Sequence, residues 1–427
     1  METDGPKATR QHVRAGHGQR AVVVWEWELL AAAEPVQNWP KVTLVARLPS
    51  RIHVQVRRGH VSPHEHGADH APVAPFTAWP GSPPPAFHKE SLSMRPNQSA
   101  FIRTRLIHEN YKAVQLTAKL LHRAKVPCSL LKIDIAKAFD TVNLRFLIDL
   151  LRHLGFSRCW VNWISIILST AGTKVILNGV PGRRICHARG LRQGDPLSPL
   201  LFVLVMEVLN ALIKLADQKS LLCTLHSKVK ERAFMYADDV VIFSSPEQQD
   251  LAAIRAILEI FAGASGLKTN LAKCHISPIH CNLDTTVQLL NLFPGKLDPF
   301  PIKYLGIPLG LRKLSKRDLQ PLVDKVANRL PTWKAGLLNR AGRTVLVKST
   351  LSAIPTHMAL AVNLSPWLIK SIDTYRRGFL WSGNQSAKGG HCLLAWPRVC
   401  RPTELGGLGI VDLQRFGYTL RMRWLWL

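Results

Sequence analysis

Three aspartates are the residues whose type and spacing could do chemistry in this sequence. Asp134 follows an apolar run, and Asp238 and Asp239 stand side by side 104 positions later. Mg²⁺ takes oxygen ligands and usually binds only a few carboxylates, leaving the remaining positions to water and substrate phosphates. Two such ions about 4 Å apart can activate a hydroxyl and hold a triphosphate, which is what nucleotidyl transfer needs. The aspartates therefore indicate a two-metal site for Mg²⁺, with Mn²⁺ as a substitute.

Each aspartate also has an ordinary explanation when it is taken alone. An Asp-Asp pair often lies in a solvated turn, because aspartate tolerates unusual backbone angles. A single aspartate after a strand often caps the next helix. The elements that surround the three residues must decide between these interpretations.

The apolar patterns around the aspartates predict elements that could bring them together. Residues 130–135 predict a buried strand, and residues 143–154 predict a helix that stops at Gly155. Residues 232–236 and 240–244 predict a β-hairpin with both carboxylates of the pair at its tip. The expected fold class is therefore α/β (α+β) with an antiparallel sheet. The site would form by pairing of strands that are distant in the sequence.

Three further helices are predicted along the chain. Ser198 and Pro199 predict an N-cap and a first-turn proline for an apolar helix that runs to about residue 212. Apolar residues over 251–261 predict a helix that ends in the glycine region 263–266, and residues 319–330 predict an amphipathic helix.

The charge of the chain points to a polyanionic partner. The 427 residues include 56 Lys and Arg against 28 acidic residues, a net charge of +28. Nucleic acid is favoured as this partner, because phosphate contacts that release counterions supply most of the affinity. An acidic membrane surface is disfavoured, because no basic amphipathic helix stands out in the sequence. Residues 296–348 hold 12 basic and three acidic residues. The residues predicted to grip a phosphate backbone are Lys303, Arg312, Lys313, Lys316, Arg317, Lys325, Arg329, Lys334, Arg340 and Arg343.

Other features bear on the compartment and on the ends of the chain. The eight cysteines are scattered without a C-x-x-C pair, which indicates a reducing compartment rather than a disulfide framework or a zinc knuckle. No signal stretch follows Met1, and the apolar run 200–206 is too short to cross a bilayer. We expect a soluble intracellular protein, cytoplasmic, nuclear or both, with no membrane partner.

The two ends of the chain differ from its centre in composition. Residues 1–90 hold eight of the 17 histidines and several prolines, which predicts a poorly ordered leader. Its histidines at 60, 64, 66 and 70 could bind zinc, but no cysteine accompanies them, so a solvated segment is preferred. The C-terminal residues 366–427 are rich in tryptophan. Tryptophans can stack on unpaired bases, although packing against a core is the commoner role.

Five segments carry a family resemblance, in order and at the family's spacing. They are KIDIAKAFDTV (132–142), GLRQGDPLSPLLF (190–202), FMYADDVVIFS (234–244), SGLKTNLAKC (265–274) and KYLGIPLG (303–310). They resemble the palm motifs of the reverse transcriptase domain of LINE-type (non-LTR) retrotransposons, of the plant type and truncated. The resemblance runs from about residue 96 to residue 347 and continues more weakly beyond it.

The resemblance implies an RNA-directed DNA polymerase with a right-hand architecture. Residues 91–310 would form partial fingers and a palm, residues 311–365 a basic, helical, thumb-like region, and residues 366–427 a truncated C-terminal segment. Its partners would be an RNA template, a DNA primer or target, and dNTPs, while protein partners are not indicated.

The resemblance also assigns roles at the carboxylates. Asp134 and Asp238 would be the main metal ligands, Asp239 would complete the carboxylate set, and the Ile135 carbonyl would assist. Lys273 would protonate or neutralise the leaving pyrophosphate, although a surface lysine is the ordinary explanation.

Four more residues would bind the nucleotide. Phe139 would lie under the sugar and exclude a 2′-hydroxyl, with a core aromatic as the alternative. Gln193 and Gly194 would pack against the nucleotide and template base, with a plain turn as the alternative; glycine permits close backbone approach. Arg105 would contact the triphosphate, a task that suits a bidentate guanidinium.

The chain also departs from the family pattern. Thr104 stands where the family usually has glycine, and an Arg-Pro-Ile-Ser-Leu-like fingers motif is absent. No endonuclease domain, ribonuclease H domain or Cys/His knuckle is recognisable, so we expect that this product alone does not transpose. A catalytically silent remnant that binds nucleic acid is therefore the alternative function. A metal-dependent nuclease is disfavoured, since no His or Glu base lies near the aspartates in the sequence.

Overall fold

The computed structural model describes residues 96–329, 337–384 and 392–425. The expectations for the leader 1–90, including its histidines, and for Lys334 lie outside these residues. Two compact units divide the described chain. One contains Ile148–Ser165, and the other contains the described residues of the ranges 93–147 and 166–427. The larger unit holds the aspartates.

The predicted helix after residue 143 is confirmed as α3 (Leu144–His153), and α4 (Arg158–Ser169) follows it. Asn143 caps α3, because its Oδ1 accepts hydrogen bonds from the backbone N–H groups of Arg145 and Phe146 at 3.0 and 3.2 Å. In the smaller unit, the ring of Phe156 stacks on Trp160 with centroids 4.5 Å apart.

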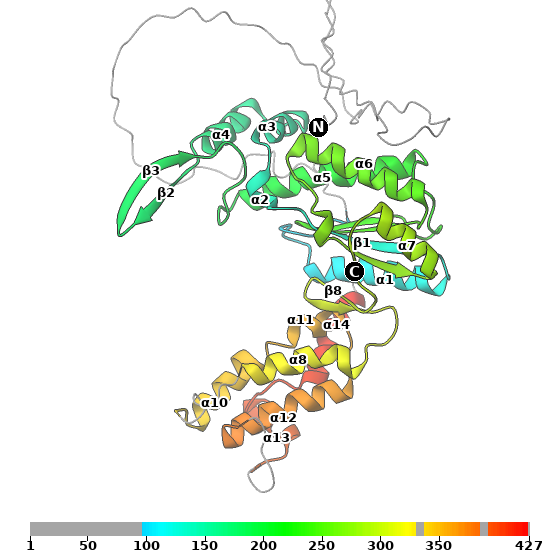
Figure 1. Ribbon diagram of the computed structural model, residues 1–427. Coiled ribbons are helices and arrows are strands. Elements are labelled where there is room, and N and C mark those ends of the chain that lie inside the picture. Colours follow the sequence, from blue (N-terminus) through cyan, green and yellow to red (C-terminus); the bar gives the residue numbers. More distant parts are fainter. Residues whose placement is uncertain (1–95, 330–336, 385–391, 426–427) are drawn as a thin grey trace, which may run out of the picture. The chain divides into compact units, whose positions relative to one another are not determined.

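A five-stranded sheet in the order β4-β5-β1-β6-β7 forms the centre of the larger unit (Figure 1). The central strand β1 (Cys128–Ile133) is antiparallel to both β5 (Asp239–Ser244) and β6 (His275–Ile279). At the edges, β4 (Ala233–Tyr236) is antiparallel to β5, and the short β7 (Lys296–Leu297) is parallel to β6. The predicted α/β class with a largely antiparallel sheet is confirmed.

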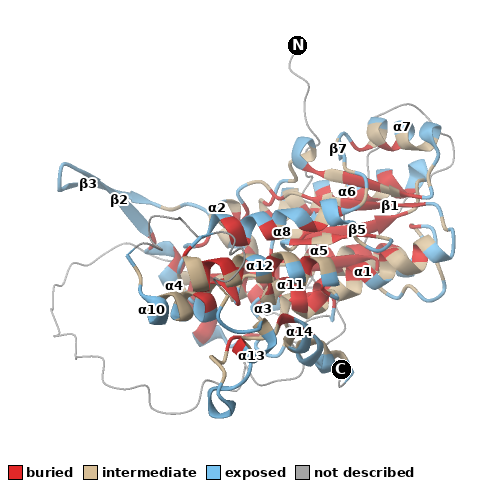
Figure 2. Ribbon diagram, turned by 90° about the horizontal axis from the view of Figure 1, so that it is seen from below, coloured by how far each residue is buried: buried red, intermediate tan, exposed pale blue. Residues whose placement is uncertain are grey.

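Helices cover both faces of this sheet, which explains why β1 is apolar without alternation. On one face, α1 (Ile107–Arg123) contributes Tyr111 and Val114 to the same core cluster as Leu130. Figure 1 shows α5 (Ser198–Gln218) and α6 (Gln248–Ser265) on the other side of the sheet. The strands and covering helices are mostly buried (Figure 2).

Two predictions about α5 are wrong. Ser198 does not cap the helix, because the cap position is Leu197, whose N–H donates to Asp195 Oδ1 at 2.8 Å. The helix continues to Gln218 instead of stopping near residue 212, since Ile213 and Ala216 still bury their side chains in the core.

The expectation that this apolar run is too short to cross a bilayer also needs correction. The whole helix is 21 residues long and passes such a test by length and composition, yet 56% of its apolar window is buried inside the protein. We therefore interpret α5 as a core helix.

Further short elements lie before and after α6. Before it are α2 (Ala138–Thr141) and the separate hairpin of β2 (Gly172–Leu177) and β3 (Val180–Cys186). After it are the 3₁₀ turn η2 (Leu271–Lys273) and α7 (Leu283–Leu292). The prediction that α6 ends in the glycine region is confirmed. Gly266 closes the helix at φ 81° and lies against the Thr141 carbonyl, so close that a Cβ there would be 2.4 Å from its oxygen.

Helices dominate the chain after the small hairpin of β8 (Ile302–Tyr304) and β9 (Ile307–Leu309). The predicted amphipathic helix is confirmed as α8 (Lys316–Asn328), which begins with a capping box between Ser315 and Asp318. It packs against α12 (Pro366–Ser382). The remaining elements are α10 (Arg340–Leu346), the π-helical turn η3 (Val347–Leu351), α11 (Thr356–Ala361), α13 (Trp396–Val399), η5 (Thr403–Leu405), α14 (Leu413–Met422) and η6 (Arg423–Leu425).

A fully buried arginine organises these C-terminal helices. Arg376 of α12 donates to Asp373 Oδ1 at 2.7 Å, to Ser352 Oγ at 2.9 Å and to the Val411 carbonyl at 2.6 Å. Its guanidinium also lies 5.3 Å from the ring centre of Trp396. The contacts of Trp396 support packing, rather than base stacking, as the role of this tryptophan.

Candidate active site

One cavity of about 130 Å³ brings the three aspartates together at the end of β1. The predicted metal ligands and the predicted catalytic lysine all lie in its wall. Its lining residues are Lys132, Ile133, Asp134, Ile135, Asp238, Asp239, Lys273 and His275. The convergence of carboxylates from two distant strands is therefore present in the fold.

The pairing register of β1 and β5 sets this convergence. Ile133 lies opposite Val240, so the next step along both strands places Asp134 beside Asp239. The chain after β1 is held in turn by the segment before η2. The Asp134 carbonyl accepts from Asn270 N–H at 2.8 Å, and Ile135 forms a single antiparallel bridge with Thr269. These bonds fix the direction in which the chain leaves β1.

The hairpin that carries the other two carboxylates has a strained turn. Tyr236 and Asp239 form its last pair, so Ala237 and Asp238 are the two turn residues. The prediction of the hairpin is confirmed, although Asp239 is the first residue of β5 and not part of the tip. Ala237 has φ 54°, a left-handed conformation that side chains with a Cβ disfavour. Such strain persists only where the surrounding structure enforces it.

Gln98 supplies part of that enforcement. Its side chain is fully buried, and its Oε1 accepts from Ala237 N–H at 3.4 Å and from Ala100 N–H at 3.0 Å. The backbone around it extends the edge of β4, because Met235 N–H donates to the Asn97 carbonyl at 2.9 Å and Ser99 N–H donates to the Met235 carbonyl at 3.2 Å. Sequence reasoning missed this residue, and its only signal was its place as the first residue of QSAFIRTRLIHEN (98–110), the segment that resembles part of the family's fingers and contains Arg105.

Buried asparagines continue this support behind β4. Asn97 and Asn210 exchange amide hydrogen bonds at 2.7 and 2.9 Å, and Asn97 also donates to the Ala233 carbonyl at 2.7 Å. Asn110 donates to the Met235 carbonyl at 2.7 Å and accepts from the Tyr304 hydroxyl at 2.6 Å. The network joins α1, α5 and β8 to the strand before the turn, and hydrogen-bonded polar groups of this kind fix a single arrangement.

The electrostatics of the cavity favour a bound cation. Burial raises the pKa of Asp239, the nearby Lys132 ammonium lowers it, and the charges of Asp238 and Asp134 raise it further. A divalent cation would relieve this repulsion, and carboxylates are the ligands that Mg²⁺ prefers. Among the described residues, no three His, Cys, Asp or Glu side chains are placed so that they could hold a metal ion by themselves. The carboxylates could therefore contribute oxygen ligands to a divalent cation, whose remaining ligands would have to come from outside these side chains.

Lys273 lies in the same wall, at the end of η2. Its side chain is exposed, while its backbone N–H donates to the Asn270 carbonyl at 3.0 Å. Cys274, the next residue, is buried, and its Sγ accepts from the Asp134 N–H at 3.4 Å. The lysine is thus attached to the aspartate segment by its neighbour.

Three of the four predicted nucleotide-binding residues, Phe139, Gln193 and Gly194, are grouped, but they do not line the carboxylate cavity. Phe139 of α2 stacks on Phe202 of α5 with ring centres 4.5 Å apart. The loop that holds Gln193 docks on α2, because Gln193 Nε2 donates to Asp140 Oδ1 at 3.3 Å. Gly194 has φ 88°, which explains glycine at this position. The structure brings the predicted sugar gate and the predicted base-packing loop to one place.

Arg105 also lies outside the lining of the cavity. Its guanidinium donates a hydrogen bond to the Gln98 carbonyl. Arg105 therefore contacts the backbone of Gln98, the residue whose side chain supports the turn that carries Asp238.

Of the basic residues predicted to bind nucleic acid, Lys303 lies in β8 and the other described ones lie in and around α8 and α10. All the described ones are exposed except Arg343, which is half-buried. The acidic residues of α8 are engaged locally, since Asp318 pairs with Ser315 and Asp324 accepts from Gln320 at 2.8 Å. The exposed positive charge of this helix remains available to a polyanion.

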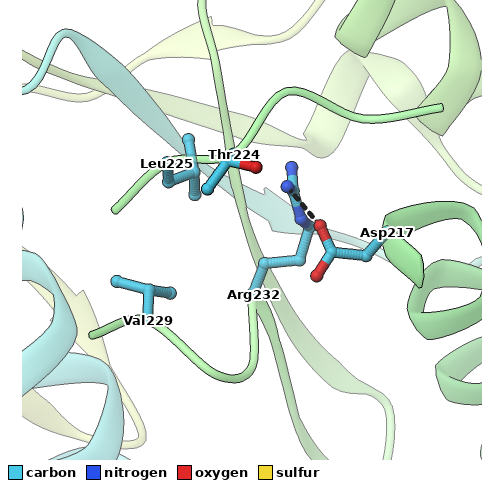
Figure 3. A pocket seen from close by; sticks show the side chains of 5 residues that line it. All are labelled: Asp217, Thr224, Leu225, Val229 and Arg232. Atoms are coloured by element: carbon cyan, nitrogen blue, oxygen red, sulfur yellow. Dashed lines mark hydrogen bonds and ion pairs between the residues drawn. The ribbon is translucent and has the colours of Figure 1, made fainter. Parts of the chain in front are cut away.

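A second cavity of about 90 Å³ is lined by Asp217, Thr224, Leu225, Val229 and Arg232 (Figure 3). Figure 3 shows Arg232 and Asp217 pointing toward each other, with an ion pair of 2.5 Å. Arg232 also contacts the fully buried Asp250 at 3.3 Å. Two carboxylates thus neutralise one guanidinium, so the cavity does not favour phosphate. These ion pairs join α5 and α6 to the residue before β4.

Comparisons with known proteins agree with this geometry. A family model described as reverse transcriptase (RNA-dependent DNA polymerase) matches residues 87–309. The chain is 26% identical over 337 residues to a transposon TX1 uncharacterized 149 kDa protein of Xenopus laevis, covering 77% of this chain and 25% of that protein. It is 30% identical over 191 residues to a retrovirus-related Pol polyprotein from the type-2 retrotransposable element R2DM of Drosophila melanogaster, covering 43% and 17%. The chain therefore spans a quarter or less of the length of these relatives.

Solved structures that are similar to this chain include a telomerase of Candida tropicalis in complex with a fragment of telomeric RNA. Its match has a TM-score of 0.38 and 12% identity, and covers 78% of this chain and 55% of that one.

Proposed function

This chain belongs to the reverse transcriptase family, of the LINE (non-LTR) type, and we propose that its carboxylate cavity catalyses RNA-directed DNA synthesis. The observation that supports the proposal is the convergence of Asp134, Asp238 and Asp239 in one cavity beside Lys273. The substrates would be an RNA template, a primer or target DNA, and dNTPs. The primer 3′-oxygen would form a bond to the α-phosphorus as the bond to pyrophosphate breaks.

The three carboxylates and the Ile135 carbonyl would hold Mg²⁺, with Mn²⁺ as a substitute. When bound, the ions would make the primer hydroxyl more acidic and neutralise the triphosphate. Lys273 would supply a proton or a positive charge to the leaving pyrophosphate.

The grouped residues outside the cavity would orient the substrates. Phe139 would lie beneath the deoxyribose and reject a 2′-hydroxyl, and Gln193 with Gly194 would contact the nucleotide and template base. Arg105 would contact the triphosphate, and the exposed cations around α8 would hold the template-primer backbone. We place the reaction in a reducing compartment, the cytoplasm or the nucleus, because the eight cysteines are scattered.

Primer extension on a primed RNA tests the assignment. We expect the purified chain to incorporate labelled dNTPs with Mg²⁺, and Asp238→Ala to reduce incorporation by about a thousandfold or more. Asp284→Ala, which removes an exposed aspartate at the start of α7, is the matched control. Equal incorporation by Asp238→Ala and the control would reject the polymerase assignment.

A catalytically silent remnant that binds nucleic acid is the second candidate. The position of Arg105 favours it, since this guanidinium bonds to the Gln98 carbonyl and does not line the carboxylate cavity. This candidate predicts salt-sensitive RNA binding without any incorporation, whereas RNA binding that salt does not weaken would count against it.

A further inference from the structure

The hairpin formed by β2 and β3, residues 172–186, is named here the arm. Its two strands pair only with each other, and every residue in them is exposed (Figure 2). Asn178 and Gly179 form its turn at φ 49° and φ 84°. Asn-Gly is the preferred sequence for a turn of this kind, which matches the twist of the flanking strands. The arm is therefore shaped by its own sequence.

The end of the arm near the turn is apolar. Leu177 exposes 74% of its surface, and Ile176 and Val180 expose 68% each. Pro181 lies opposite Ile176 in the register, and Val180 lies opposite Leu177. An isolated two-stranded hairpin is only marginally stable in water, and exposed apolar patches commonly mark interaction sites. These residues, 176–181, are called the tip.

The rest of the arm, called its basic part, carries three cations beside the exposed apolar side chains of Val175 and Ile185. Lys174, Arg183 and Arg184 lie in its strands, which contain no acidic residue, and no acidic residue occurs anywhere in 150–194. Lys174 stands directly opposite Arg184 in the strand register. Like charges in this position repel each other, and the Arg184 guanidinium donates a hydrogen bond to the Thr170 carbonyl. This charge also opposes docking of a second copy of the same arm.

From this combination we propose that the arm binds nucleic acid at a fork, where a duplex opens into single strands. The basic part would contact phosphates, and the tip would pack against the face of the terminal base pair. Base faces are hidden inside a continuous duplex, so an apolar tip beside cations suits an opened end. Aliphatic and proline side chains serve as wedges between bases in other nucleic-acid complexes.

The inference rests on the proposed function, because a polymerase that copies structured RNA must open paired template. Contacts with the separated end lower the free energy of opening. The arm would thus make the chain favour forked substrates over closed duplexes.

Binding is measured by fluorescence anisotropy on three RNAs, which are a fork, a duplex closed by a loop at each end, and a single strand. The full chain carries Asp238→Asn throughout, so that no synthesis occurs and failure of the polymerase assignment leaves this test intact. Leu177→Ser with Val180→Ser changes the tip, and Lys174→Gln with Arg183→Gln changes the basic part. The matched controls are Leu283→Ser with Val287→Ser, two exposed apolar residues of α7, and Lys228→Gln with Lys230→Gln, two exposed lysines.

We expect the tip variant to bind the fork about tenfold more weakly, the size of a lost base contact, and to bind the closed duplex as well as the parent does. The variant of the basic part should bind all three RNAs more weakly, with a salt slope smaller by about two. Neither control should change the preference for the fork. Equal fork binding by the tip variant and the parent overturns the proposal. So does light scattering that shows a parent dimer lost in the tip variant with fork binding intact, since the tip would then cover a second copy.

Discussion

The chain contains two hairpins that reach their turns in opposite ways. The hairpin of β4 and β5 has a buried β5 and bonds to β1, and its turn places Ala237, a residue with a Cβ, at φ 54°. The arm is exposed on both strands, and its turn uses Asn178 and Gly179, which accept positive φ. Contacts with the rest of the protein hold the turn between β4 and β5, whereas the residue types of Asn178 and Gly179 are sufficient for the turn of the arm.

The difference explains where each hairpin can carry function. A turn held by tertiary contacts can keep a strained backbone and present Asp238 in a fixed direction, which electrostatic catalysis requires. A turn that forms by local preference leaves its side chains free of the core. Such a hairpin can use its whole surface to contact a partner.

Substituting valine for the first turn residue of each hairpin should give the largest difference between the two hairpins. Ala237→Val puts a β-branched residue at φ 54° and should cost about 1–3 kcal/mol of unfolding free energy. Displacement of Asp238 should lower primer extension by about a hundredfold. Asn178→Val, at φ 49°, should leave both the melting temperature and extension on an open template unchanged.

Thermal melting and single-nucleotide incorporation measure the two variants side by side. Equal losses in Ala237→Val and Asn178→Val would show that tertiary enforcement does not distinguish the turns.

Removing the support of the strained turn should have the next largest effect. Gln98→Met keeps a similar volume but leaves the N–H of Ala237 and the N–H of Ala100 without their acceptor, at a cost of about 1–3 kcal/mol. We expect kcat to fall about tenfold and the Mg²⁺ concentration at half-maximal activity to rise, with RNA affinity unchanged.

Gln115→Met is the matched control, because Gln115 is a buried glutamine of α1 whose amide donates to the Tyr111 hydroxyl at 3.3 Å and does not reach the turn. A metal-binding titration by calorimetry separates a positioning role from general destabilisation. If both methionine variants shift the Mg²⁺ affinity equally, Gln98 does not position the turn.

Local patterns were sufficient to predict the elements that support the aspartates. The apolar run of β1 and the hairpin of β4 and β5 followed from apolar patterns and turn residues. The capping of α5 was mispredicted, because the cap position is Leu197, whose N–H donates to Asp195 Oδ1, and Ser198 has no capping role. The arm was missed although Asn178-Gly179 is a strong local hairpin signal.

The site was predictable only where chemistry requires a residue type. The three aspartates were selected as the oxygen ligands that Mg²⁺ needs, and Lys273 was selected through the family resemblance; one cavity is lined by all four residues. Gln98 could not be found in this way, because it meets Ala237 from 139 positions away and neither residue belongs to a periodic pattern. Buried amides that support a turn depend on tertiary contacts, which a single sequence does not display.

The charge on Asp239 should make the enforced hairpin sensitive to pH. Burial and the neighbouring carboxylates raise its pKa, so the folded protein holds this proton more tightly than the unfolded chain does. Stability from this group is therefore complete below the unfolded pKa and is lost as pH rises through the folded pKa. Asp239→Asn should remove that loss, so metal-free protein should melt at a higher temperature than the parent at about pH 7.

Melting curves from about pH 4 to pH 7, without metal and with Mg²⁺, measure this effect. Asp284→Asn, which changes an exposed aspartate, should follow the parent at every pH. Mg²⁺ should raise the melting temperature of the parent more than that of Asp239→Asn. A melting temperature of Asp239→Asn that falls with pH as steeply as that of the parent would contradict the raised pKa.

The smallest expected effect is confined to the arm. Gly179 has φ 84° and open space where a Cβ would stand, so Gly179→Ala meets backbone strain without a clash. The strain of about 1 kcal/mol should weaken only the pairing of β2 with β3. Faster hydrogen exchange of amides in 172–186 would report this, with unchanged exchange in β5 and an unchanged melting temperature. Because the arm folds by its own preference, slower exchange in the arm or a lower global melting temperature would show that its turn is coupled to the core after all.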